Sequence, residues 1–183
     1  MIYLIMNIGF NRVKIIKKQL NFIDRDTLEN ITVDSELFKI SYPENISGDI
    51  KLYFTITGTD GTPWEGLVFK GILTYGMNYP TSAPTLRFIT KLYHPNVFPS
   101  GELCISILHD GIDQYGSEDI SLRWSPAHTI NTILKSTQTL FNDPNCDSPA
   151  NCSAKINYQN NIETMKHNVN KYYNKEIASR HKM

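Results

Sequence analysis

The sequence predicts an α+β domain, and three patterns carry that prediction. Between about Asn11 and Asp26, apolar residues recur at three- and four-residue steps, as on one face of a helix. From Ile50 to Thr57, apolar and polar residues alternate, which is typical of a half-buried strand. Helical spacing returns after Ser125 and continues almost to the end of the chain. Helices on both sides of a group of strands indicate an α+β fold.

The predicted N-terminal helix presents one apolar stripe, formed by Val13, Ile16, Leu20 and Ile23. Residues 1–10 are mostly apolar and are interpreted as an N-terminal extension before a single domain of residues 11–183. The extension has no basic segment before it and is too short to span a bilayer. We expect it to pack on the domain or on a partner, with contact to a membrane surface as the alternative.

The strand at residues 50–57 belongs to a predicted antiparallel meander. A turn at Gly58–Pro63 follows it, and residues 67–73 form the returning strand. Residues 85–89 form a short further strand after a proline-containing loop. The first strand of the sheet is expected in the polar stretch 27–48, at Leu37, Phe38 and Ile40.

The central helix is predicted to begin at Ser125 and Pro126. Serine caps helices, and proline at the first helical position lacks only an amide that would have no partner there. The helix should end near Asn142–Pro144. Its buried stripe is expected to contain Ile130, Ile133, Leu134, Thr137, Leu140 and Phe141. A further helical run after Pro149 has its apolar positions at Ile162, Met165, Val169, Tyr172 and Tyr173.

Composition limits the classes of partner. The formal net charge is zero, so no broad cationic surface argues for nucleic acid. The basic run Lys14–Lys18 is interpreted as a solvated helix face, with a docking face for an acidic partner as the alternative. The three cysteines, Cys104, Cys146 and Cys152, have no metal-ligand spacing and give no complete disulfide framework. A reducing cytoplasmic or nuclear setting, without a bound metal, fits this pattern.

Cys104 is the residue most suggestive of chemistry, and Asn96 precedes it by eight residues. A thiolate attacks carbonyl carbon, and the resulting oxyanion needs a fixed hydrogen-bond donor such as a carboxamide. His94 is also near enough in sequence to pair with the thiol, as in a cysteine protease. Each residue alone has a structural interpretation, because lone cysteines are often buried in cores and asparagines after proline often form turns.

Short motifs surround these residues in a characteristic order. They are Thr62–Gly66, Asn78–Pro80, Ala83–Pro84, Thr90–Asn96, Trp124–Pro126 and Asn142–Asn145. Together with Cys104, they resemble the ubiquitin-conjugating enzymes. The resemblance implies an N-terminal helix, a four-stranded antiparallel meander, an active-site segment without regular structure, a central helix and C-terminal helices. Residues 11–183 would then form the catalytic domain.

By this resemblance, Cys104 accepts ubiquitin as a thioester from an activating enzyme and transfers it to lysine. Asn96 would stabilise the oxyanion formed when the lysine amine attacks, or hold the loop so that another donor can. The position of His94 between Tyr93 and Pro95 favours a structural hydrogen-bonding role over a catalytic one.

Tyr93, Asp147 and Ser148 would line the approach of the acceptor lysine. The amine must be neutral to attack, so the site has to desolvate it and receive its proton. Ser148 stands where many relatives carry Asp, and Asp147 is adjacent. The group that handles the proton is therefore left open between these two residues.

Residues 109–123 are an insertion relative to the minimal family pattern and resemble the acidic-loop branch of the family. Its acidic residues, expected to place an acceptor ubiquitin, are Asp110, Asp113, Glu118 and Asp119. In that branch the loop commonly serves chains of the linkage that marks proteins for degradation. A tolerated polar surface insertion is the alternative.

Two positions depart from the family pattern. Thr81 stands where relatives often place an aromatic residue that docks ligases, and Lys135 where many show an apolar residue that holds donor ubiquitin. The expected partners are ubiquitin, its activating enzyme, which uses the ATP, and a RING-type ligase; no cofactor is expected. The alternatives are a catalytically weak or inactive ubiquitin-binding variant, a carrier of another ubiquitin-like modifier and, more distantly, a cysteine protease. A disulfide between Cys104 and Cys146 under oxidation is a further hypothesis.

Overall fold

The sheet is an antiparallel meander of four strands in the order β1-β2-β3-β4. Its strands are β1 (Ile31–Asp34), β2 (Ile50–Thr57), β3 (Val68–Tyr75) and β4 (Thr85–Phe88). The computed structural model describes residues 2–23, 28, 30–34, 48–111 and 119–180. Alternate residues of β2 are buried, so the half-buried strand predicted there is confirmed.

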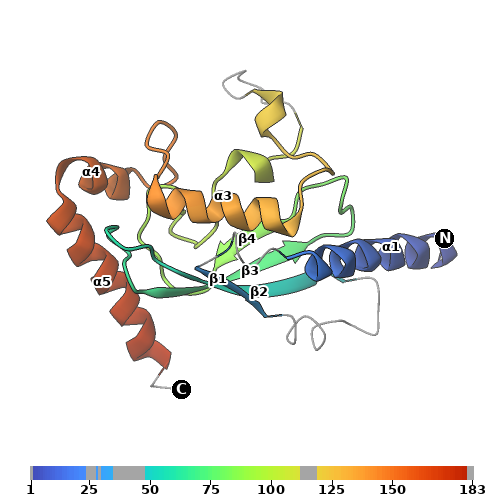
Figure 1. The fold of residues 1–183 in the computed structure, drawn as a ribbon, viewed down its shortest axis with the longest axis horizontal. Helices are drawn as coiled ribbons and strands as arrows, with labels where there is room; N and C mark the ends of the chain where they lie inside the picture. The colour runs from blue at the N-terminus through green and yellow to red at the C-terminus, as the bar shows by residue number, and fades with distance from the viewer. Residues whose placement is uncertain (1, 24–27, 29, 35–47, 112–118, 181–183) are drawn as a thin grey trace.

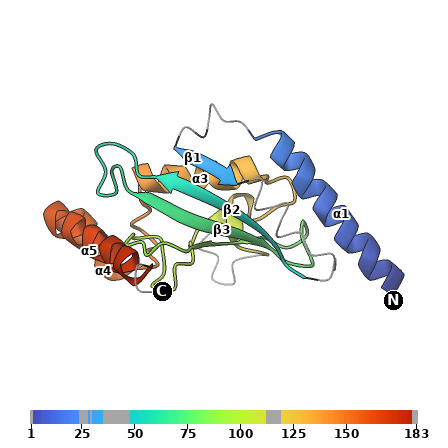
Figure 2. The ribbon, with the colours of Figure 1, turned by 90° about the horizontal axis from the view of Figure 1, so that it is seen from below.

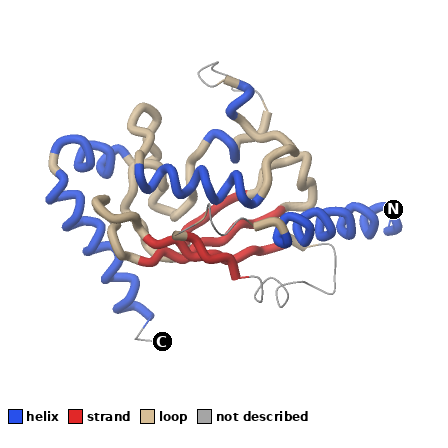
Figure 3. Tube along the Cα trace, viewed as in Figure 1, coloured by secondary structure: helices blue, strands red, loops and turns tan. Residues whose placement is uncertain are grey.

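Helices cover one face and both ends of this sheet. They are α1 (Ile2–Asn21), α3 (Ile130–Asn142), α4 (Cys152–Asn160) and α5 (Ile162–Arg180), with short 3-10 helices η1 (Ser106–Leu108) and η2 (Ile120–Leu122). Figure 1 shows α3 lying across the sheet, and Figure 2 shows α1 at one end with α4 and α5 at the other. The chain between β4 and α3 is mostly loop (Figure 3). The predicted α+β fold is confirmed.

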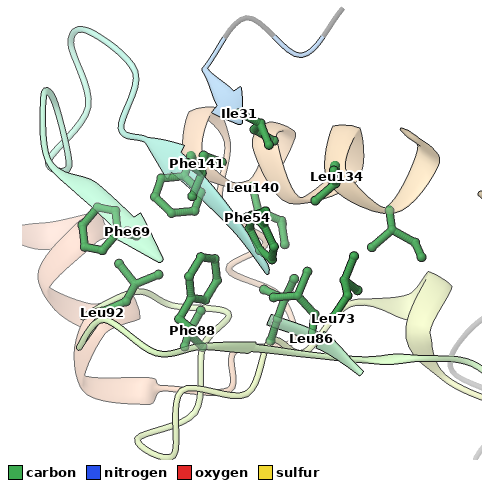
Figure 4. Packing of buried hydrophobic residues seen from close by; sticks show 14 of the residues in the cluster. Ile31, Phe54, Phe69, Leu73, Leu86, Phe88, Leu92, Leu134, Leu140 and Phe141 are labelled. Carbon is green, nitrogen blue, oxygen red and sulfur yellow. The ribbon is translucent and has the colours of Figure 1, made fainter. Parts of the chain in front are cut away.

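The core lies between the sheet and α3 (Figure 4). All six residues of the apolar stripe predicted for α3 are buried. On the sheet, the rings of Phe54 and Phe88 meet edge to face with their centroids 6.1 Å apart. Gly71 lies opposite Phe54, and a Cβ built on Gly71 would come within 2.3 Å of the Phe54 ring. The aromatic packing therefore requires glycine at this position.

Arg12 fastens α1 to the sheet. Its guanidinium is buried and donates to the carbonyl oxygens of Tyr75 at 3.2 Å and Gly48 at 2.7 Å. Burial lowers the pKa of Arg12, while Asp49 acts in the opposite direction. Since buried charges are stable only with partners, these carbonyl contacts fix the position of α1 at the end of the sheet.

The predicted start of the first helix is wrong. The helix begins at Ile2 instead of about Asn11, and it ends at Asn21, before the predicted Asp26. Residues 2–10 are mostly apolar, so they lack the one-sided period that would mark a helix in the sequence. The division between an extension and a domain at residue 10 stays a prediction.

The predicted start of the central helix is also wrong, because α3 begins at Ile130. The Thr129 hydroxyl accepts from the N–H of Thr132 at 3.3 Å, and the Thr132 hydroxyl accepts from the N–H of Thr129 at 2.7 Å. This capping box satisfies two amides at once. Ser125 instead closes a turn, where its hydroxyl accepts from the N–H of Ala127 at 3.1 Å.

The first strand lies earlier than predicted, at Ile31–Asp34, because four residues are too few to show a period. Leu37, Phe38 and Ile40 lie outside the described residues. The C-terminal helical run is divided at Asn161, whose N–H caps α4 and whose side chain accepts from the N–H of Thr164 in α5. Of its predicted apolar positions, Met165 and Val169 are buried, whereas Ile162 and Tyr172 are exposed.

Candidate active site

Cys104 lies in the extended chain just before η1, and neighbouring backbone holds it on one side. Its N–H donates to the carbonyl oxygen of Asn96 at 2.9 Å. The residue before it, Leu103, is buried, pairs with Val97 and donates its N–H to Leu86 of β4 at 2.9 Å. The side chain of Cys104 is half-buried, so its thiol is positioned by the fold and still reachable from solvent.

His94 is a buried, neutral hydrogen-bonding residue. Its Nδ1 accepts from the N–H of Asn96 at 2.9 Å, so Nε2 carries the proton that is donated to the carbonyl oxygen of Leu140 at 3.0 Å. Its ring packs on Trp64 with the centroids 4.5 Å apart. Burial lowers the pKa of His94 to about 4, because the charged form is not solvated there. This geometry supports the structural role expected from the sequence.

The side-chain amide of Asn96 is used at both ends. Its Nδ2 donates to the carbonyl oxygen of Asn145 at 2.7 Å, and its Oδ1 accepts from the N–H of Asn145 at 2.9 Å. Asn96 is 1% exposed. Of the two roles expected for Asn96, the geometry favours holding the loop, because the amide oxygen and one of the two amide N–H groups are already bound to Asn145.

Asn145 extends this connection to Asp147 and Ser148, which are predicted to line the approach of the acceptor lysine. Its own side-chain oxygen accepts from the N–H groups of Asp147 at 3.0 Å and Ser148 at 3.4 Å. Asp147 and Ser148 are both exposed. The sequence analysis placed Asn145 in a motif without giving it a role; an asparagine two residues before an exposed turn is the signal for such an Asx turn.

Tyr93 is buried, and its hydroxyl is occupied. The hydroxyl oxygen accepts from Nδ2 of Asn157 in α4 at 2.9 Å, and the ring packs on Tyr172 of α5 with the centroids 5.0 Å apart. Its carbonyl oxygen accepts from the indole N–H of Trp64 at 2.9 Å. Burial raises the pKa of Tyr93, and the Asn157 hydrogen bond acts against that rise. Tyr93 therefore joins the active-site segment to both C-terminal helices.

His109 was missed by the sequence analysis as a site residue. Its Nε2 lies 3.8 Å from the sulfur of Cys104. His109 ends η1, and its carbonyl oxygen accepts from the N–H of Trp124 at 3.0 Å. It is five positions after the cysteine, and the tight 3-10 turn brings the two side chains together. An imidazole at this distance can exchange a proton with the thiol.

Residues 22–173 match the family model described as ubiquitin-conjugating enzyme. The chain belongs to the ubiquitin-conjugating enzyme family. It is 43% identical over 126 residues to the ubiquitin-conjugating enzyme E2 of African swine fever virus, covering 68% of this chain and 55% of the relative. It is 41% identical over 123 residues to ubiquitin-conjugating enzyme E2 15 of Schizosaccharomyces pombe, covering 67% of this chain and 74% of the relative.

A plant relative, ubiquitin-conjugating enzyme E2 13 of Arabidopsis thaliana, is 42% identical over 118 residues, which is 64% of this chain and 71% of the relative. The matched part of the chain thus spans about half of the viral relative and more than two thirds of the fungal and plant ones. The family expected from the sequence motifs is confirmed, and with it an enzyme of the ubiquitin-conjugating type.

Two of the four acidic residues of the insertion, which are predicted to place an acceptor ubiquitin, form hydrogen bonds within the protein. Asp110 is exposed, and its carboxylate accepts from the N–H of Ala83 at 2.7 Å. Asp119 caps η2, and the backbone hydrogen bond from Ser121 is the main reason why its pKa is lowered. Asp113 and Glu118 lie outside the described residues. The insertion is therefore joined at its start to the loop that contains Thr81.

The two departures from the family pattern are both exposed. Thr81 lies in the turn that follows Pro80, whose carbonyl oxygen accepts from the indole N–H of Trp124 at 2.9 Å. Lys135 lies on α3, and its ammonium is 3.4 Å from the side-chain oxygen of Gln138. Both side chains are accessible to a binding partner.

The cysteines and the acidic residues form no other centre in the described residues. None of the three cysteines, all of which are described, is in a disulfide, and burial raises the pKa of Cys146. Over the described ranges, no group of three His, Cys, Asp or Glu side chains could hold a metal ion. In the same part of the chain, no helix combines the length and apolar character needed to cross a membrane.

Proposed function

We propose that this protein carries ubiquitin as a thioester on Cys104 and transfers it to the amine of a lysine. The observation that carries the proposal is the fixed position of Cys104. Its side chain is half-buried, and its backbone N–H donates to the carbonyl oxygen of Asn96 at 2.9 Å, while the side chain of Asn96 is hydrogen-bonded to Asn145. A nucleophile held in one orientation loses little entropy when it reacts. The family membership supports the same chemistry.

The proposed reaction has two acyl transfers. In the first, the sulfur of Cys104 attacks the thioester carbonyl of ubiquitin on the activating enzyme, the carbon–sulfur bond to that enzyme breaks, and its thiol is released. In the second, a neutral lysine amine attacks the new thioester, an amide bond forms, and the Cys104 thiolate leaves and is reprotonated. Both steps pass through an oxyanion.

His109 and Asn96 have different proposed roles in these steps. His109 exchanges the proton of the Cys104 thiol, because its Nε2 lies 3.8 Å from the sulfur. Asn96 is a positioning residue, because both ends of its amide are bound to Asn145. Asp147 and Ser148 are the exposed residues of the turn that Asn145 shapes, and they line the proposed approach of the lysine.

Ubiquitin, an activating enzyme and a RING-type ligase are the proposed partners, in a cytoplasmic or nuclear setting. Placement of an acceptor ubiquitin by the insertion at residues 109–123, for chains of the degradation-signalling linkage, is the finer part of the proposal. It is supported by the exposed carboxylates of Asp110 and Asp119 at the two described ends of the insertion.

The test is a charging assay with activating enzyme, ATP and ubiquitin, followed on gels with and without reductant. We expect an adduct that reductant removes, and no adduct with Cys104→Ala. Cys104→Ser should give an oxyester that resists reductant, and the matched controls Cys146→Ala and Cys152→Ala should charge normally. An adduct only with another ubiquitin-like modifier would transfer the proposal to that modifier. No adduct with any of them would favour a ubiquitin-binding variant without catalysis.

A further inference from the structure

A cavity of about 640 Å³ lies between the chain that leaves β4 and the helix α5. Its walls are residues 87–92 and 99–101, Asn151, and Lys171, Tyr172 and Lys175 of α5. Cys104, Asn96 and His109 do not line it. The cavity is therefore distinct from the thiol site, and we refer to it as the cationic groove.

Four lining residues give the groove its charge: Arg87, Lys91, Lys171 and Lys175. All four are exposed. Among the described residues, no acidic one lines the groove and none forms an ion pair with any of the four. Because the whole chain has a formal net charge of zero, this concentration of charge is local. Positive groups gathered in a hollow focus a potential that attracts anions.

The groove also exposes apolar surface. Ile89 and Tyr172, which line it, are 39% and 41% exposed, and Phe98, beside the lining residue Pro99, is 41% exposed. Large apolar side chains left in water next to cations are typical of surfaces that bind other proteins. The ligand is therefore expected to be apolar as well as anionic.

A polypeptide fits these walls better than a nucleic acid does. Binding of single strands depends on aromatic faces on which bases stack. One face of Tyr172 already packs on Tyr93, and Phe88 is buried in the core. The aliphatic side chain of Ile89 offers contact to an apolar side chain but no stacking platform.

We propose that the cationic groove binds an acidic polypeptide segment that carries an apolar side chain. The groove adjoins the active-site segment: the N–H of its wall residue Asn151 donates to the carbonyl oxygen of Pro95 at 2.9 Å, and Tyr172 contacts Tyr93. A polypeptide held there lies next to the active-site segment at Tyr93 and Pro95. The binding itself does not depend on the proposed carrier activity, so the Cys104→Ala chain should bind equally well.

The test is fluorescence anisotropy with the full chain and a labelled peptide of glutamates around one leucine. The wild type should bind saturably, and Lys171→Glu/Lys175→Glu should bind about tenfold more weakly or worse, because two attractive charges become repulsive. The matched control is Lys14→Glu/Lys51→Glu, which makes the same change in net charge at exposed positions of α1 and β2. That control should retain wild-type affinity within about twofold at physiological salt.

A second peptide tests whether the groove also recognises an apolar side chain. Replacing the leucine of the peptide by serine should weaken binding several-fold, because the apolar contact is lost. Circular dichroism of both double variants verifies that they fold. Equal weakening in the two double variants would show a net-charge effect only and overturn the proposal. Tighter binding of a labelled single-stranded oligonucleotide than of the peptide would overturn it in favour of nucleic acid.

Discussion

The side chain of Asn96 and the backbone of Asn145 form a closed pair of hydrogen bonds, 2.7 Å and 2.9 Å long, across 49 residues of sequence. The same two residues connect the rest of the site. Asn96 holds the N–H of Cys104 through its carbonyl oxygen, and Asn145 holds the turn at Asp147 and Ser148 through its side chain. The thiol and the turn are thus fixed relative to each other by one amide pair.

Asn96→Ala is expected to slow transfer of ubiquitin to lysine more than it slows charging of Cys104. The substitution leaves the N–H and carbonyl of Asn145 without their side-chain partner, so the turn at Asp147 loses its fixed position. The thiol of Cys104 keeps its position, because its backbone N–H is bound to the backbone carbonyl of residue 96. Stability should fall by about 1–3 kcal/mol, because two partly buried hydrogen bonds worth about 0.5–1.5 kcal/mol each are lost. Single-turnover discharge to free lysine, charging rates and urea unfolding measure the three quantities.

The matched control for that variant is Asn142→Ala, an exposed asparagine at the end of α3. It should leave transfer and stability unchanged within about 0.5 kcal/mol. A variant at Asn96 that transfers ubiquitin slowly with no loss of stability would contradict the positioning role and favour direct contact with the oxyanion.

Stability is expected to fall in acid because of His94. In the folded state its pKa is about 4, below the ordinary value of 6.5, so the unfolded chain takes up this proton first as the pH falls. The stability that neutral His94 contributes is therefore fully present above about pH 6.5 and is lost as the pH falls from there to about 4. Below about pH 4, His94 causes no further loss. The loss is on the order of 3 kcal/mol.

Urea unfolding across this pH range checks the acid loss. His167→Gln is the control, because His167 is exposed on α5 and its replacement should leave the pH dependence intact. A wild-type stability that stays level between neutral pH and pH 5 would rule out a neutral buried His94.

The sequence was informative where a residue type allows few environments. Cys104, Asn96 and His94 belong to motifs specific enough to predict the family, and the alternation in β2 predicts which side chains are buried. The contact of His109 with Cys104 could not be predicted from a pattern, because it depends on a three-residue 3-10 turn. The start of α3 was misplaced because Ser125 has the residue type of a cap but closes a turn, whereas the reciprocal hydrogen bonds that cap the helix are made by Thr129 and Thr132.

Gly71→Ala is expected to destabilise the fold by about 1–3 kcal/mol, because an added methyl group overlaps the Phe54 ring. Gly76→Ala is the matched control, since a Cβ at that position has no atom within 4 Å. Thermal unfolding of the two variants gives the comparison. If both variants unfold at the same temperature as the wild type, the inferred close contact between Gly71 and the Phe54 ring is wrong.

His109→Gln is expected to lower the rate of Cys104 charging about tenfold at neutral pH, because the thiol must then lose its proton to solvent. Glutamine preserves size and hydrogen bonding, so a loss reflects the imidazole and not the space it fills. The charging rate of the variant should rise more steeply with pH than that of the wild type, since hydroxide replaces the missing base. His128→Gln is the control, because the His128 ring packs on Trp124 with the centroids 5.7 Å apart. This replacement is expected to leave the pH profile of charging unchanged. Parallel profiles for His109→Gln and the wild type would show that the imidazole beside the sulfur takes no proton in the rate-limiting step.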